Sequence, residues 1–313
     1  MHWRLVSGLL VATTSVAAAD DPPPTPAADA APAGPVRRED ATLGQIFAGP
    51  FQSSRLFAMP TADTVGPYML ALSGEGSLLE QPGLLTSAGV VAVGFGDLAQ
   101  LEYRHTEAIS VTGLNAPVPA VGAQFRLPIP EGPNVPAIGI AYRQGLPRDE
   151  QVGNVTVEES VTDIYAVARE RLSAAPWLTL HAGVRYSPSH VTLSGGETTS
   201  AKRDLLLPAG GFELAVNREA RVVGETELVP QFHYNAGDTT PQIGTGVEAR
   251  LGLRWALFPA VTLDASFGYQ LDEAMGSIGG PRDVVQEWDI RLGAEVFVPW
   301  GALACRAAGV FCD

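Results

Sequence analysis

The residues best placed to do chemistry in this chain of 313 residues are charged side chains on the polar positions of alternating stretches. The predicted strands between residues 118 and 186 point arginines to their polar face, whereas those after residue 204 point mostly carboxylates to it. Opposed charges either pair to close and stiffen a narrow interior, or create a field that orients dipolar and charged solutes in a wet passage. Both interpretations stay open because they need the same residues. The candidates are Arg126, Arg143, Arg169, Arg185, Glu225, Glu227, Glu248, Arg250, Arg254, Glu287, Asp289 and Arg291.

Catalytic sets are harder to assemble from this sequence. His181 and His233 are the histidines on polar positions, and they are the best candidates for a hydrolase. On a strand, however, His233 would lie about 20 Å from Glu227, which is too far for a direct contact. Neither a Gly-x-Ser-x-Gly nucleophile elbow nor a His-Glu-x-x-His zinc motif occurs. We therefore predict no enzyme activity, no cofactor and no metal site.

The elements that carry these charges are strands with a period of two. In 244–257 apolar side chains alternate with polar or small residues such as Glu248, Arg250 and Arg254. The stretches 261–271 and 285–298 repeat the pattern. Such alternation puts one face of each strand in an apolar medium and the other in a polar one. After the N-terminal apolar run, no stretch is long enough for a transmembrane helix.

The same test predicts twelve strands, each of about the length that a tilted strand needs to cross a membrane. The predicted connections alternate in length, the longer ones being 79–85, 110–117, 146–160, 187–203, 235–243 and 272–284. Short turns on one side and long loops on the other are typical of transmembrane barrels. The predicted strands are 67–78, 86–95, 98–109, 118–128, 135–145, 161–172, 176–186, 204–216, 221–234, 244–257, 261–271 and 285–298.

Aromatic residues gather at the ends of these strands on the apolar face, as expected where a barrel meets the two membrane–water boundaries. A soluble β-sandwich, the alternative, would bury them near the middle of its strands. The long-loop ends carry Tyr142, Tyr186, Phe232, Tyr234, Tyr269 and Trp288, and the short-turn ends carry Tyr68, Phe95, Phe125 and Trp255.

The sequence divides into five segments. Residues 1–19 have the charged, apolar and small-residue order of a secretory signal peptide. The Pro/Ala-rich residues 20–40 form a disordered linker, and 41–66 are a periplasmic lead-in packed under the barrel, a plug, or a docking segment. The barrel spans 67–298. The tail, 299–313, holds Cys305 and Cys312, which we expect to form a disulfide in an oxidising compartment.

The charge balance excludes one class of partner. The net charge is −14, whereas nucleic-acid binding needs clustered Lys and Arg. Several carboxylates lie in predicted loops, for example Asp149-Glu150 and Asp272-Glu273. These belong to solvated loops or bridge divalent cations to lipopolysaccharide.

Residues 60–300 resemble Gram-negative outer-membrane β-barrels in pattern. The last strand, Arg291 to Val298, is similar to the C-terminal assembly signal of that group. The resemblance implies outer-membrane lipid, lipopolysaccharide and the barrel-assembly machinery as partners. A second, shorter resemblance is to barrels associated with exopolysaccharide export. It rests on Leu56 to Asp63, on Gly210-Gly211-Phe212-Glu213 and on Val223-Gly224-Glu225.

The sequence thus predicts an all-β, antiparallel up-and-down transmembrane barrel of about twelve strands. Its expected function is that of a passive pore or an envelope-transport component with a charged lumen, taking small solutes or exopolysaccharide. The alternative is a non-channel scaffold or binding barrel for exopolysaccharide or envelope partners. An outer-membrane hydrolase is the third hypothesis.

Overall fold

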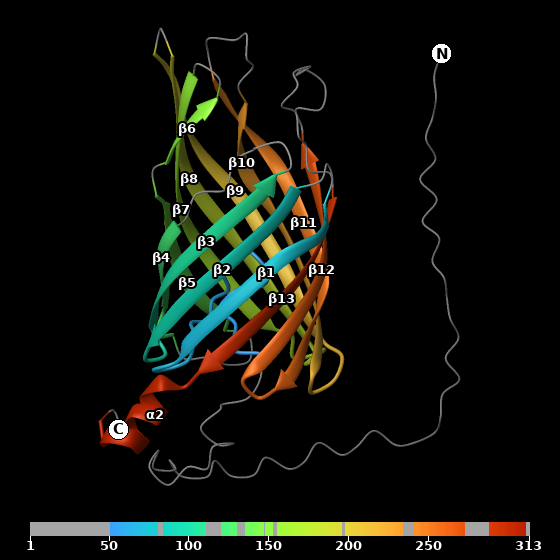
Figure 1. Ribbon diagram of the computed structural model, residues 1–313. Coiled ribbons are helices and arrows are strands. Elements are labelled where there is room, and N and C mark those ends of the chain that lie inside the picture. Colours follow the sequence, from blue (N-terminus) through green and yellow to red (C-terminus); the bar gives the residue numbers. More distant parts are fainter. Residues whose placement is uncertain are drawn as a thin grey trace, which may run out of the picture. The chain divides into compact units, whose positions relative to one another are not determined.

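The strands form one closed antiparallel sheet. The computed structural model describes residues 51–80, 84–110, 120–129, 135–146, 148–152, 155–195, 198–233, 241–272 and 288–310. Twelve strands in these ranges form the barrel wall, and a short thirteenth, β6, pairs only with β7 (Figure 1). The wall strands are β1 (Leu70–Glu80), β2 (Leu84–Phe95), β3 (Ala99–Ser110), β4 (Ala120–Arg126), β5 (Ala137–Gly145), β7 (Val155–Arg171), β8 (Leu178–Ser194), β9 (Thr199–Ala215), β10 (Ala220–His233), β11 (Gln242–Phe258), β12 (Val261–Asp272) and β13 (Trp288–Val298).

Closure follows from two pairings that leave no open edge in the wall. The first and last strands pair, with Leu70 opposite Val298. The strand β6 does not stand between β5 and β7 in the wall. Instead, β5 pairs directly with β7, with Ala137 opposite Arg169. The remaining neighbours are consecutive antiparallel strands. In lipid every backbone polar group must be paired, and a closed barrel meets that requirement.

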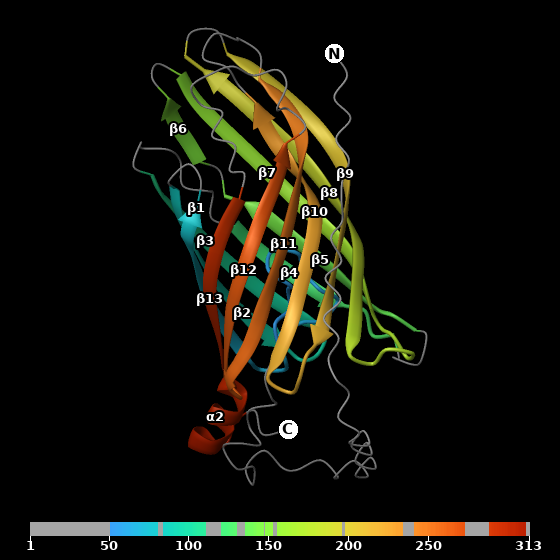
Figure 2. The ribbon, with the colours of Figure 1, turned by 90° about the vertical axis from the view of Figure 1, so that its right-hand side faces the viewer.

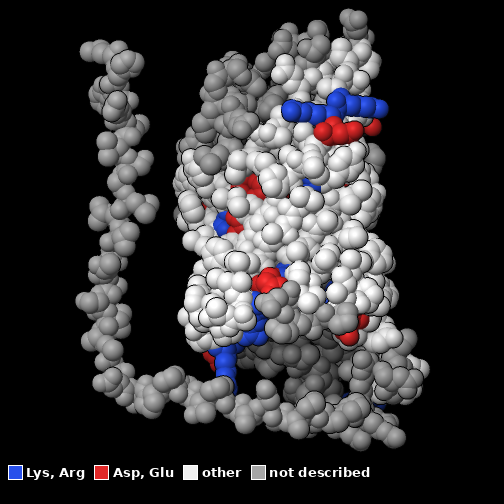
Figure 3. Space-filling view, turned by 180° about the vertical axis from the view of Figure 1, so that it is seen from behind, with Lys and Arg blue, Asp and Glu red and all other residues white. Residues whose placement is uncertain are grey.

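Large apolar side chains cover the outside of the barrel. Leu251, Leu253 and Phe267, for example, are 53%, 44% and 50% exposed. Polar residues of the same strands, such as Arg254 and Ser266, are buried inside. The face drawn in Figure 3 is accordingly mostly uncharged over its height. The period-two prediction is confirmed: hydrocarbon-facing and lumen-facing residues alternate along each strand.

The sequence prediction was wrong about two connections. It made loops of 146–160 and 187–203, but β6 (Arg148–Val152), the start of β7, the end of β8 and the start of β9 extend the sheet there (Figure 2). His190, expected in a loop, lies in β8 opposite Ser160 and Lys202. Buried apolar side chains explain the extension, because their burial offsets the entropy of ordering the chain. They are Val157, Val191, Leu193, Leu205, Leu207 and Ile243.

Two aromatic residues also differ from expectation. Tyr68 precedes β1, has a left-handed backbone with φ of 53°, and meets the ring of Trp300 edge-on at 5.4 Å. Phe232 packs against the buried cluster of the β7–β9 extension rather than facing lipid. Tyr68 lies outside the wall because β1 begins at Leu70 rather than at residue 67. Tyr142, Tyr186 and Tyr269 remain exposed near one end of the wall, and Phe95, Phe125 and Trp255 near the other.

A helix, α2 (Trp300–Ala308), follows β13 and lies at the same end of the barrel as residues 51–66 (Figure 1). It ends at Gly309, whose left-handed φ of 67° suits glycine. This helix was not predicted, although Ala, Leu and Arg are good helix formers. None of the helices in the described ranges is long and apolar enough to cross a membrane.

Several sequence predictions fall outside the described residues. The signal peptide 1–19, the linker 20–40, residues 41–50 and the candidates Glu287 and Cys312 all lie there. Cys305 is buried on α2, and its disulfide with Cys312 stays a prediction.

Candidate functional site in the barrel lumen

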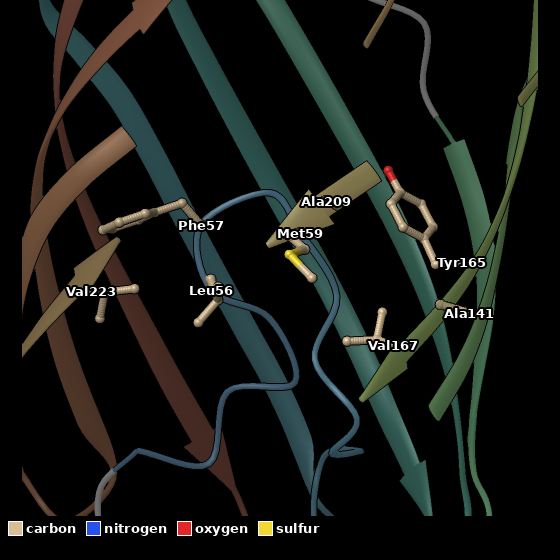
Figure 4. Close-up of a cluster of buried hydrophobic side chains, with 8 residues drawn as sticks. All are labelled: Leu56, Phe57, Met59, Ala141, Tyr165, Val167, Ala209 and Val223. Carbon is tan, nitrogen blue, oxygen red and sulfur yellow. The ribbon is translucent and has the colours of Figure 1, made fainter. Parts of the chain in front are cut away.

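A segment of the chain that precedes the barrel lies inside it. Residues 51–66, here called the inner segment, run into the lumen and return as a narrow loop (Figure 4). Arg55 and Pro60 form a bridge, and the Leu56 N–H donates to the Met59 carbonyl at 3.0 Å. Residues 56–59 are therefore the tip of the loop, and they point away from the short-turn end.

The carboxylate of Glu225 holds this tip. It accepts backbone N–H groups from Phe57 at 2.9 Å, from Ala58 at 3.0 Å and from Met59 at 3.2 Å. Buried N–H groups must find acceptors, and a buried carboxylate must find donors. Here the N–H groups and the carboxylate satisfy one another. Hydrogen bonds to a charged acceptor are also stronger than those to a neutral one.

Arginines bind the carbonyl groups of the same loop. Arg143 donates from Nη1 to the Ala58 carbonyl at 2.8 Å. Arg254 donates from Nη2 to the Leu56 carbonyl at 2.5 Å and from Nη1 to the Arg55 carbonyl at 3.3 Å. The N–H groups of the tip thus donate to a carboxylate, and its carbonyl groups accept from guanidinium groups, as the polarity of the peptide group requires. The three predicted residues Arg143, Glu225 and Arg254 converge on one loop.

Two glutamines complete the anchoring and were missed by the sequence analysis. Gln100 accepts the Val65 N–H at 2.7 Å and donates to the Ser54 hydroxyl at 2.9 Å. Gln124 donates to the Thr61 carbonyl at 2.9 Å. Both are almost fully buried. Both have the lumen-facing parity of β3 and β4 in the sequence. They were missed because the candidate residues were chosen by charge, and glutamine is uncharged.

Apolar packing fills the space around the tip. Leu56 and Met59 have no exposed surface, although they lie inside a barrel. Figure 4 shows them directed at wall residues on both sides, and the sulfur of Met59 lies among them. The cluster consists of Leu56, Phe57, Met59, Ala141, Tyr165, Val167, Ala209 and Val223.

Lumen-facing glycines give the inner segment its room. A Cβ atom on Gly139 of β5 would stand 2.8 Å from the Cα of Ala62. One on Gly94 of β2 would stand 2.3 Å from the carbonyl oxygens of Val65 and Gly66. Cβ atoms do not approach backbone so closely, so only glycine allows this contact. The wall is therefore shaped to the segment at two strands, β2 and β5, which are separated by β3 and β4.

Most of the remaining predicted charges are paired within the wall. Arg185 bonds Asp163 at 2.7 Å and approaches Glu227 at 3.7 Å, and Arg254 bonds Asp264 at 2.8 Å. Arg126 and Arg169 both reach Asp63 of the inner segment, at 3.5 and 2.7 Å. The sequence predicted an arginine-rich wall opposite an acidic one. The structure instead places most pairs between nearby strands or against the inner segment.

Two of the ion pairs cross a glycine on the strand between them. Glu102 of β3 reaches Arg143 of β5 at 2.6 Å over Gly122, which lies level with both. Arg250 of β11 reaches Asp289 of β13 at 2.9 Å over Gly268 in the same way. A side chain on the middle strand would occupy the path of the guanidinium. This rule was not recognised from the sequence, although both glycines have the lumen-facing parity.

The histidines do not form a catalytic set in the described residues. His181 lies 3.3 Å from Glu213, which also pairs with Arg221. Of His233, the structure describes the backbone in β10 but not the side chain. Within the described ranges, no group of three or more His, Cys, Asp or Glu side chains is arranged to hold a metal ion.

Fold and lumen together define the class of protein. A closed antiparallel barrel with apolar residues outside and ion-paired polar residues inside is a transmembrane β-barrel of the Gram-negative outer-membrane type. The protein accordingly resides in the outer membrane. Its short turns lie at the same end of the barrel as α2 and the start of the inner segment (Figure 1).

The chain has weak similarities to solved structures. No family model and no curated protein matches the chain. Among solved structures, the NanC porin is 13% identical with a TM-score of 0.46, over 72% of this chain and 98% of that one. The KdgM porin is 11% identical with a TM-score of 0.41, over 73% and 98%. The translocator domain of the autotransporter NalP from Neisseria meningitidis is 15% identical with a TM-score of 0.39, over 73% and 86%.

Proposed function

We propose that the protein is a gated transport barrel of the outer membrane, whose passage the inner segment closes at rest. The observation that carries the proposal is the capture of three consecutive N–H groups, Phe57 to Met59, by Glu225. A wall residue that serves a loop tip in this way gives the loop one defined resting place. The charged side chains of the lumen suit the passage of polar solutes.

The form of the anchoring supports a gate over a permanent core. The polar anchoring of the tip runs through its backbone, which donates to Glu225 and accepts from Arg143 and Arg254. If the segment withdrew, water could solvate these side chains, and the wall ladders would remain intact. Because the segment continues toward the periplasmic side, a pull on residues preceding it would act on the tip directly.

The test is conductance across a planar bilayer. The full-length protein should show small or rare openings, and a variant lacking residues 51–66 should show a steady conductance. Heat-modifiable migration on a denaturing gel establishes that each protein is folded. Should the deletion prevent folding, Glu225→Ala weakens the tip contact and is expected to raise the fraction of time open.

The alternative is a scaffold or binding barrel with no passage, serving exopolysaccharide or envelope partners. Folded deletion and Glu225→Ala proteins that conduct no more than wild type would overturn the gate and favour the scaffold. The shorter resemblance to exopolysaccharide-export barrels includes both the tip and Glu225, so this alternative concerns the same residues.

A further inference from the structure

A cavity of about 330 Å³ lies in the lumen beside the tip of the inner segment. Phe57 and Ala58 form part of its boundary, and β1, β2, β3 and the strands β10 to β13 supply the rest. Three arginines and four carboxylates line it. A lining with nearly equal numbers of positive and negative groups favours neither a simple anion nor a simple cation. What the cavity can bind therefore depends on which of these groups already have a partner in the protein.

Most of these charges are already satisfied by the protein. Arg250 makes two parallel hydrogen bonds to Asp289, both at 2.9 Å. Arg291 forms ion pairs with Asp289 at 2.5 Å and with Glu75 at 3.5 Å. Glu225 is occupied by the loop tip. Two charged groups of the lining remain, one of each sign.

The first is Arg104 on β3. Its guanidinium forms no hydrogen bond or ion pair with any described residue, and its Nε is buried without a partner. Two carboxylates act on it electrostatically, Glu102 and Glu75. Glu102 is bound to Arg143 and Glu75 is near Arg291. A partly buried guanidinium in this state gains from an anionic oxygen, which it can bind through two N–H groups.

The second is Glu248 on β11. Within the described ranges it has no hydrogen bond or ion pair, and it lies directly opposite Glu227 in the β10–β11 register. Like charges directly opposite one another destabilise a sheet. An ammonium group at Glu248 would relieve that repulsion and find a strong acceptor.

We propose that this cavity binds a small zwitterion, with its carboxylate at Arg104 and its ammonium group at Glu248. The volume is at the lower end of ordinary ligand sites, which suits a molecule of amino-acid size. The proposal deepens the proposed function, on which its meaning as a transport site rests. The tip residues Phe57 and Ala58 bound the cavity, so a bound solute would also contact the gate.

Binding is measured on the folded full-length protein in detergent, by calorimetry and without any flux. The probes are ω-amino acids from glycine to aminohexanoate, with butyrate and butylamine as singly charged analogues at matched ionic strength. At least one ω-amino acid should bind about tenfold tighter than either analogue, as expected when a second charge-assisted contact is added. This comparison needs no variant.

Two variants assign the ends of the ligand. Arg104→Gln should remove the preference over butylamine, and Glu248→Gln should remove the preference over butyrate, each with about tenfold weaker binding of the zwitterion. Arg203→Gln, far out on β9, is the control and should bind as wild type.

Equal binding of all probes, no binding of any, or unchanged binding in both variants would overturn the zwitterion site. A failure of the gate would leave these affinities intact, and a failure of the site would leave the conductance of the deletion variant intact.

Discussion

The carboxylate of Glu225 accepts a hydrogen bond from the backbone N–H of Phe57 at 2.9 Å, although 168 positions separate them in the chain. The contact joins the middle of a wall strand to a loop that enters the barrel before the first strand. It also makes the loop testable by substitution of a single side chain. Four predictions follow from this contact, from the glycines beside it and from the wall.

Replacing Glu225 should release the tip of the inner segment. In Glu225→Gln the amide offers one oxygen and brings two donors against three N–H groups, at a cost of about 2–4 kcal/mol. The peptide bond after Arg55, held inside the lumen, should then become cleavable by trypsin. Mass spectrometry of the digest measures the cleavage. Glu248→Gln, a lumen carboxylate with no contact to the tip, should leave it protected, and equal protection in both variants would contradict the prediction.

A methyl group on Gly139 should push the inner segment off β5. Its Cβ would stand 2.8 Å from Ala62, whereas a Cβ on Gly89 of β2 would meet nothing closer than 3.9 Å. Gly139→Ala should therefore raise bilayer conductance, and Gly89→Ala should conduct as wild type. Identical conductance in the two variants would mean that the segment moves without opening a passage.

Removing Arg143 should destabilise the barrel as well as the loop. The substitution leaves Glu102 buried without its partner at 2.6 Å, which costs about 3–5 kcal/mol. The urea midpoint of Arg143→Met should fall clearly, and Glu102→Gln added to it should restore part of the loss. Arg171→Met, an exposed residue, should change stability by less than about 0.5 kcal/mol. A double variant less stable than Arg143→Met would argue against an uncompensated charge.

The lipid-facing band predicts a dependence on depth. Leu251 lies at mid-height of the wall, whereas Leu257 lies near the short-turn end of the same strand. Leu251→Arg should lower the free energy of unfolding in lipid by about 2–4 kcal/mol, and Leu257→Arg by about 0–1 kcal/mol. Unfolding titrations in vesicles measure both. Equal costs at the two depths would contradict the position of the barrel in the membrane.

The alternation along each strand was enough to predict the barrel, because a strand that separates hydrocarbon from a polar interior must repeat with a period of two. For the same reason Arg143, Arg185, Glu225 and Arg254 were correctly placed on the lumen face. The extension of β7 to β9 was missed. Val191 and Leu193 alternate with polar residues as well, but their partners on neighbouring strands were needed to make that alternation a sheet.

The pairing inside the lumen was decided only by the tertiary structure. Parity states which way a side chain points, but it does not state which strands lie level with one another. It therefore could not show that Glu102 meets Arg143 over Gly122, or that Arg104 and Glu248 border one cavity. The entry of residues 51–66 depends on contacts with strands up to 199 positions away, which no local pattern records. Local alternation determined the wall, and long-range packing determined what fills it.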